Sequence, residues 1–206
     1  MKVYINGLGN ISPQQTHDGE IAVAGMKLLQ TTRNSCIEPE YANFVDPKQL
    51  RRMSRIIRMG VASSILAMKD SGIEKPEAII VGTAFGCLED TYSFLSKLIL
   101  HKEDMLSPTA FIHSTHNTIA AQVALLFQCR GYNSTYVHKS ISFESALIDG
   151  LLLLNEKTAN QVLVGGVDEI INAGYTILNR LGHYKKNEEL STHTFPGIKN
   201  KGIGCR

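Results

Sequence analysis

Hydrophobic positions along the chain form two kinds of pattern, short continuous apolar runs and longer stretches with helical spacing. Apolar runs at residues 3–8, 78–83 and 161–166 predict strands, and the last two are typical of strands covered on both faces. Residues 134–137 are short and β-prone and predict another strand. Because these strands alternate with helical stretches, the chain is predicted to be an α/β protein with a layered, predominantly parallel sheet.

Several helices are predicted from apolar residues at helical spacing. Asp46 and Pro47 provide an N-cap and a first-turn proline for a helix whose apolar stripe stops at Gly72. Further helices are predicted near 22–29, at about 88–100 and 119–127, and from Phe143 onward, whereas 107–118 is polar and predicts a loop. With 206 residues, the chain can form one substantial core or two small ones.

The composition is that of a soluble globular protein and excludes several classes of function. The chain is 43% hydrophobic and 19% charged with a net charge of +2, so no nucleic-acid partner is expected. No apolar run approaches the roughly 18 residues that cross a bilayer, and nothing resembles a signal peptide. We therefore expect a cytoplasmic protein without membrane association. The four cysteines are scattered without Cys-x-x-Cys spacing, so no metal site, disulfide framework or cofactor is expected.

One basic stretch stands out in this nearly neutral chain. Its members are Lys48, Arg51, Arg52, Arg55 and Arg58. The stretch is typical of the solvated face of a helix, although an acidic carrier protein bearing phosphopantetheine could also bind such a face.

The most informative feature is a strand, turn and helix sequence at residues 133–154, with Phe143 where the apolar helix opens. A side chain in the first turn of a helix is well placed to be ionised or to lie beside an oxyanion, because the first N–H groups are unpaired. A phenyl ring can use neither property. Ser140, Ser142 and Ser145 supply nearby hydroxyl groups, but serines ordinarily cap helix starts, and no Gly-x-Ser-x-Gly motif surrounds them.

Four segments in order resemble motifs of the β-ketoacyl synthases, the condensing enzymes of the thiolase superfamily. These segments are 50–55 (LRRMSR, like Arg-Arg-Met-Asp-Arg), 82–86 (GTAFG, like Gly-Thr-Gly-x-Gly), 107–124 (like Ser-Pro-x-x-x followed by Asn-x-x-Ala-Gly-x-Ile-Ala) and 164–168 (VGGVD, like Ala-Gly-Gly-x-Glu). The resemblance implies a thiolase-like layered fold, specifically its N-terminal βαβαβαββ half with a mostly parallel mixed sheet covered by helices.

The same resemblance implies that the catalytic cysteine is missing. The family's helix begins Ala-Cys-x-x-x-Leu, and counting back from Leu147 places Phe143 at the cysteine. A condensing enzyme needs a thiolate there to hold the acyl chain as a thioester, which Phe143 cannot form. A register shift of one residue would instead place Ser142 at the apex of the turn, and Cys87 in the glycine turn is another candidate nucleophile.

The resemblance also implies that this chain covers only the first half of the family fold. We expect a β-ketoacyl synthase N-terminal-like domain at 1–197, a divergent tail at 198–206, and no C-terminal half. The family's two active-site histidines lie in that second half, so His113, His116 and His138 are not given their roles, and His116 is expected to make a loop or interface hydrogen bond. An isolated half would expose a sheet edge and apolar helix faces, and it should therefore pair with another chain.

The leading hypothesis is a non-catalytic, chain-length-factor-like protein of fatty-acid, polyketide or aryl-polyene biosynthesis. The resemblance implies a homodimer, or a heterodimer with an active β-ketoacyl synthase, that works with acyl carrier protein. Phe143 would fill volume near the dimer boundary. The alternatives are an acyltransferase or condensing enzyme with Ser142 or Cys87 as a displaced nucleophile, or a truncated or frame-shifted inactive fragment. Whether the chain is an enzyme stays open, although it is not expected to be active alone.

The family arrangement makes one further prediction about assembly. The strand at 134–137 is expected at the dimer edge, paired antiparallel with its copy in the partner. The loop at 107–116 is expected to reach across the interface.

Overall fold

The computed structural model of the protein describes residues 2–17, 33–104, 106–184 and 204–205. The chain divides into two compact units, one formed by Met1–Asn10 and Glu40–Asp168 and the other by Ile11–Pro39 and Glu169–Arg206. The predicted helix at 22–29 lies outside the described residues. In the described part of the chain, no helix is long and apolar enough to cross a membrane.

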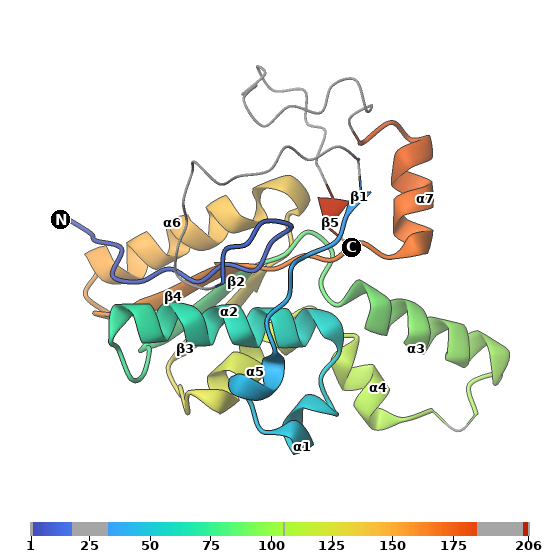
Figure 1. Cartoon of the computed structure of the whole chain (residues 1–206), viewed down its shortest axis with the longest axis horizontal. Helices are drawn as coiled ribbons and strands as arrows, with labels where there is room; N and C mark the ends of the chain where they lie inside the picture. The colour runs from blue at the N-terminus through green and yellow to red at the C-terminus, as the bar shows by residue number, and fades with distance from the viewer. Residues whose placement is uncertain (1, 18–32, 105, 185–203, 206) are drawn as a thin grey trace. The chain divides into compact units, whose positions relative to one another are not determined.

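The helices and strands follow one another in the order drawn in Figure 1. They are β1 (Arg33–Asn34), the 3-10 turn η2 (Tyr41–Asn43), α1 (Pro47–Leu50), α2 (Arg55–Ser71), β2 (Ala78–Gly82), α3 (Leu88–Leu100), α4 (Pro108–His113), α5 (Thr118–Leu126), β3 (Tyr132–Tyr136), the 3-10 turn η3 (Lys139–Ile141), α6 (Ser142–Asn155), β4 (Val162–Gly166), α7 (Asn172–Arg180) and β5 (Gly204–Cys205).

A three-stranded sheet with the strand order β3-β2-β4 forms the centre of the first unit. Both pairings are parallel, and Gly82 at the end of β2 lies level with Tyr136 of β3 and Gly166 of β4. Every residue of β2 is buried, which confirms the predicted central strand. The prediction of an equally buried strand at 161–166 is corrected, because β4 pairs on one side only in the described sheet and its residues are half-buried or exposed. The strand near 134–137 lies at a sheet edge, as expected.

Helices cover both faces of this sheet. Figure 1 shows α6 on one face and α2 with α5 on the other. The main core lies on the α2 and α5 side, where each fully buried aliphatic side chain contributes about 1.5–3 kcal/mol. It is formed by Val45, Met53, Ile56, Ile57, Val61, Ile79, Val81, Cys87, Ile119, Ala120 and Val123.

The helical segment at 46–72 matches its predicted ends but is interrupted in the middle. The Asp46 carboxylate accepts a hydrogen bond from the Lys48 N–H at 2.7 Å, and Gly72 ends α2 with a positive φ of 67°. The single predicted helix is corrected to α1 and α2, because Ser54 is extended (ψ 169°) and therefore starts a new helix. Extended backbone at this residue turns the chain between the two helices.

Two other predictions are corrected by the structure. Residues 3–8 form no strand, since this segment lies along α2 and the Leu8 N–H donates to the Asp70 carboxylate (2.9 Å) instead of to a neighbouring strand. The predicted loop at 107–118 contains the short helix α4, which begins with Pro108 in its first turn. A proline at that position favours helix formation even within a polar segment.

The second unit contains β1, β5 and α7. β1 pairs with β5 in parallel, with Arg33 opposite Gly204. The Arg33 guanidinium donates to the Asn172 side-chain oxygen (2.8 Å) and lies 5.1 Å from the centre of the Tyr175 ring, which stacks on Tyr184. A cation–π contact and a hydrogen bond thus join β1 to the start of α7.

Replacement of Gly82 should test the close contact between β2 and α6. In Gly82→Ala, the new methyl carbon would lie 2.5 Å from the Ser142 carbonyl oxygen and 2.7 Å from the Phe143 nitrogen, both backbone atoms. We expect the free energy of unfolding in urea to fall by about 1–3 kcal/mol. Gly165→Ala is the matched control, because nothing lies within 4 Å of its methyl position. Equal stability of the two variants would contradict this packing.

Candidate functional site

The carboxyl ends of the three parallel strands meet at one edge of the sheet, which is where open α/β sheets commonly place their sites. The Thr83 N–H donates to the Tyr136 carbonyl (2.9 Å), and the Val167 N–H donates to the Gly82 carbonyl (3.0 Å). These hydrogen bonds continue the strand pairing one residue beyond β2. The turns that leave β2 and β4 and the start of α6 are thereby held close together.

Asp168 anchors the turn after β4 to the turn after β2. Its Oδ1 atom accepts hydrogen bonds from the Thr83 hydroxyl (3.0 Å) and the Ala84 N–H (2.7 Å). The Thr83 hydroxyl also accepts from the Gly86 N–H at 2.9 Å. Burial of the carboxyl group raises the pKa of Asp168, and the hydrogen bonds from Ala84 and Thr83 act in the opposite direction. The contact between these two segments, at 82–86 and 164–168, is not predictable from the sequence.

Phe143 lies at this strand edge, in the first turn of α6. Its backbone nitrogen is next to Gly82, and its ring packs over Gly166, where an added methyl carbon would lie 3.1 Å from Cδ2 of the ring. The side chain keeps 45% of its surface exposed. A phenyl ring therefore occupies the helix start where the partial positive charge of α6 would favour an anion.

Ser142 and Cys87, the two candidate nucleophiles, are both buried. Ser142 is only 2% exposed, and its hydroxyl donates to the Lys139 carbonyl and accepts from the His138 N–H, both at 2.8 Å. These bonds close the turn η3 before the helix. Cys87 is completely buried within the hydrophobic core. In this conformation, neither side chain can contact an acyl thioester that approaches from solvent.

The three histidines His113, His116 and His138 lie on different segments of the fold. His113 ends α4, and His138 precedes η3. The His116 ring packs against the glycine turn, where a methyl carbon on Gly86 would lie 3.1 Å from its Cδ2 atom. Gly86 has a φ of +69°, so a side chain there would be strained as well as crowded.

His138 and Ser145, whose side chains lie 3.2 Å apart, form a contact that the sequence did not predict. The Ser145 hydroxyl donates its proton to the Ile141 carbonyl at 2.8 Å. While the Ser145 hydroxyl donates to Ile141, the contact with His138 requires the ring tautomer that carries a hydrogen on Nδ1. A hydrogen bond donated by the ring is the reverse of what a histidine base and a serine nucleophile need, because the base must accept the proton of the hydroxyl. The pair therefore fixes the turn before α6.

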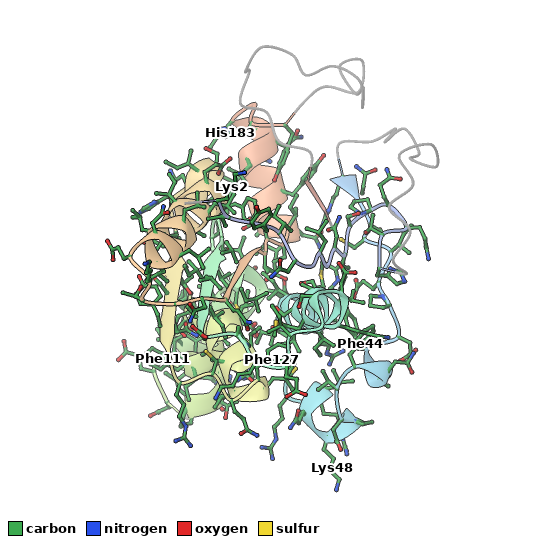
Figure 2. All side chains as sticks on the ribbon, turned by 90° about the vertical axis from the view of Figure 1, so that its left-hand side faces the viewer. Lys2, Phe44, Lys48, Phe111, Phe127 and His183 are labelled. Carbon is green, nitrogen blue, oxygen red and sulfur yellow. The ribbon has the colours of Figure 1, made fainter. Side chains whose placement is uncertain are left out.

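The basic stretch is only partly a solvated surface. Lys48, Arg51 and Arg52 are exposed, and Figure 2 shows Lys48 extending away from the fold. Arg55 and Arg58 are half-buried, and Arg58 donates to the Met53 carbonyl at 3.0 Å. In the residues that the structure describes, no group of three or more His, Cys, Asp or Glu side chains could hold a metal ion.

Comparison with protein families identifies the class to which this fold and site belong. The sequence model described as the N-terminal domain of β-ketoacyl synthase matches residues 29–185, which is more than half of the chain. The chain therefore belongs to the β-ketoacyl synthase family. A search among curated proteins finds no match.

Solved structures share the same fold at low sequence identity. A ketosynthase (ApeO) in complex with its chain length factor (ApeC) from Xenorhabdus doucetiae matches with a TM-score of 0.59 and 20% identity, over 79% of this chain and 64% of that one. A β-ketoacyl synthase from Burkholderia phymatum STM815 matches with a TM-score of 0.63 and 18% identity, over 97% and 50%.

A third match is described as a type II PKS acyl-carrier protein in complex with its ketosynthase bound to the hexaketide (AntDE:AntF). It has a TM-score of 0.71 and 16% identity, over 88% of this chain and 55% of that one. This chain thus spans less than two thirds of the length of each of the three proteins. These matches confirm the predicted thiolase-like α/β fold, with a mostly parallel sheet covered by helices.

A thiol at position 143 should be unusually reactive. In Phe143→Cys, the sulfur would sit partly exposed at the start of α6, where a helix N-terminus lowers the pKa of a thiol. We expect iodoacetamide to alkylate it about threefold faster at pH 7 than a cysteine introduced by Ser140→Cys, since a one-unit lower pKa gives about ten times more thiolate and makes each thiolate about threefold less nucleophilic. Peptide mass spectrometry measures both rates, and equal rates would contradict the assigned position of residue 143.

Proposed function

We propose that this chain is a non-catalytic, chain-length-factor-like subunit that pairs with an active β-ketoacyl synthase in fatty-acid, polyketide or aryl-polyene biosynthesis. The observation that carries this proposal is the Phe143 ring at the start of α6, packed over Gly166. Condensation passes through a thioester on the enzyme, and a phenyl ring has no atom that can form one.

The alternative of a displaced nucleophile gains no support from the described residues. The Ser142 hydroxyl is buried and engaged by two backbone groups, and the Cys87 thiol lies in the core. To take up an acyl group, Ser142 would have to break the turn before α6, and Cys87 would have to leave the core. Either change removes contacts that hold the strand edge together.

Exposed apolar surface supports pairing with another chain. On α6, four apolar side chains are between 41% and 60% exposed, namely Leu147, Ile148, Leu151 and Leu152. A second group lies on α3 and α4 and consists of Tyr92, Leu95, Ile99, Leu100, Phe111 and Ile112. Contiguous apolar surface of this kind commonly marks a protein interface.

The edge of the sheet supports the same conclusion. β3 has no strand on its outer side in the described sheet, so its outward N–H and C=O groups are available for a partner strand. We propose that it pairs antiparallel with a strand of the synthase subunit. The matched complex of a ketosynthase with its chain length factor is consistent with such a pair.

The exposed side chains of Lys48, Arg51 and Arg52 support an interaction with acyl carrier protein. Three cations within a five-residue stretch form a positive surface that would attract an acidic carrier. One matched structure contains an acyl-carrier protein bound to its ketosynthase. In this proposal, the carrier delivers the acyl chain to the active partner, and this chain helps to shape the acyl pocket.

The proposal is tested by following where an acyl group goes. The purified chain is incubated with acyl-loaded acyl carrier protein, alone and mixed with an active ketosynthase, and each polypeptide is weighed by intact-mass spectrometry. We expect no acyl adduct on this chain under either condition, since both candidate nucleophiles, Ser142 and Cys87, are buried. Ser142→Ala and Cys87→Ala should give the same result.

An acyl group on a mapped side chain of this protein would overturn the proposal. Loss of that adduct in Ser142→Ala or Cys87→Ala, but not in Phe143→Ala, would then identify the nucleophile.

A further inference from the structure

The two faces of β3 carry different contacts. Asn133 and Thr135 share one face, and the Asn133 side chain donates to the Ala120 carbonyl of α5 at 3.0 Å. Tyr132, Ser134 and Tyr136 share the opposite face, which is covered by α6. The exposed edge of the sheet therefore carries a tyrosine pair on its α6 side.

Tyr132 and Tyr136 converge on one carboxylate from α6. The Tyr132 hydroxyl donates to Asp149 Oδ2 at 2.9 Å. Burial raises the pKa of Tyr136, and its hydrogen bond with Asp149 and the negative charge of that carboxylate raise it further. The Tyr132 hydroxyl thus contacts Asp149 directly, and it provides a hydrogen bond without a compensating positive charge.

No cation in the two elements that form this surface balances Asp149. The sequence of α6 contains Glu144 and Asp149 and no Lys, Arg or His, and β3 contains no charged residue. Among the described residues, no ion pair joins Asp149 to a basic side chain. The Tyr132 ring is 44% exposed beside it, so another molecule can approach this position.

A second copy of this chain would not supply the missing charge. An antiparallel pair of β3 strands centred on Ser134 places Tyr132 of one copy opposite Tyr136 of the other. Both Asp149 carboxylates then lie on the same face of the joined sheet, near the two-fold axis. Like charges on facing elements disfavour association, whereas opposite charges favour it and help to choose the partner.

We propose that the β3 edge binds a strand of a different polypeptide, and that this partner places a Lys or Arg side chain against Asp149 between Tyr132 and Tyr136. This inference rests on the proposed function, because it specifies the chemistry of the partner. A cation there gains a carboxylate and two aromatic rings. The site therefore selects a heterodimer over a homodimer.

In the Asp149→Lys variant, a second copy of this chain supplies the missing cation to Asp149 of the wild-type copy. Wild-type protein and Asp149→Lys are mixed in equal amounts at low salt and examined by native mass spectrometry and sedimentation velocity. We expect the mixture to form a 1:1 dimer with at least a tenfold lower Kd than either protein forms with itself, a difference of about 1.4 kcal/mol. Asp149→Asn, which offers no cation, should give no such gain.

Glu144→Lys is the matched control, because it makes the same charge reversal on the same helix at an exposed position. It should not form the mixed dimer with wild type.

Thr135→Pro tests the strand edge. Tyr136 directs its carbonyl toward β2, so the Thr135 N–H points outward, and its removal should abolish the mixed dimer. If Thr135→Pro loses its cooperative melting transition, the Glu144→Lys control still decides.

Two outcomes would overturn the inference. One is a wild-type homodimer as tight as the mixed dimer, and the other is the absence of any mixed dimer between wild type and Asp149→Lys. Neither outcome bears on whether this chain accepts an acyl group, so failure here and failure of the proposed function remain distinguishable.

Discussion

The close contact between Gly82 and the start of α6 is the constraint on which the rest of the site depends. No side chain separates the end of β2 from the Ser142 carbonyl and the Phe143 nitrogen, so the helix begins directly against the strand. That contact fixes which residue of the helix meets the carboxyl edge of the sheet. It also brings residue 143 next to Gly166, although the two are far apart in sequence. The chemistry possible at this edge is then decided by the side chain at position 143.

The turns around this contact are held by a small set of directional bonds. Asp168 joins the turns after β2 and β4, and the buried hydroxyl of Ser142 closes the turn before α6. These polar groups already make hydrogen bonds within the fold. A site whose hydroxyl and carboxylate groups are already engaged in this way supports positioning and packing better than group transfer, which agrees with the proposed role beside an active synthase.

Burial is unevenly distributed over the two faces of the sheet. The side covered by α2 and α5 has a dense aliphatic core, whereas α6 on the other side leaves a row of leucines and an isoleucine partly exposed. A protein that exposes apolar helix surface together with an unpaired strand edge gains stability when another chain covers both. In our proposal, Asp149 of that helix, which accepts a hydrogen bond from Tyr132 of that edge, adds a charge requirement to what would otherwise be an unspecific apolar contact.

The sequence alone determined the elements with strong local signals. The continuous apolar run of β2 predicted a buried central strand, and Asp46 and Gly72 marked the ends of the segment that forms α1 and α2, because capping and apolar spacing are local properties. Only the tertiary structure decided that residues 3–8 pair with no strand, that Ser142 and Cys87 are buried, and that Asp168 meets Thr83. These results depend on which distant segments share an edge or a core, and no local pattern records that. That residue 143 is a phenylalanine was readable in the sequence, whereas its place over Gly166 was a product of folding.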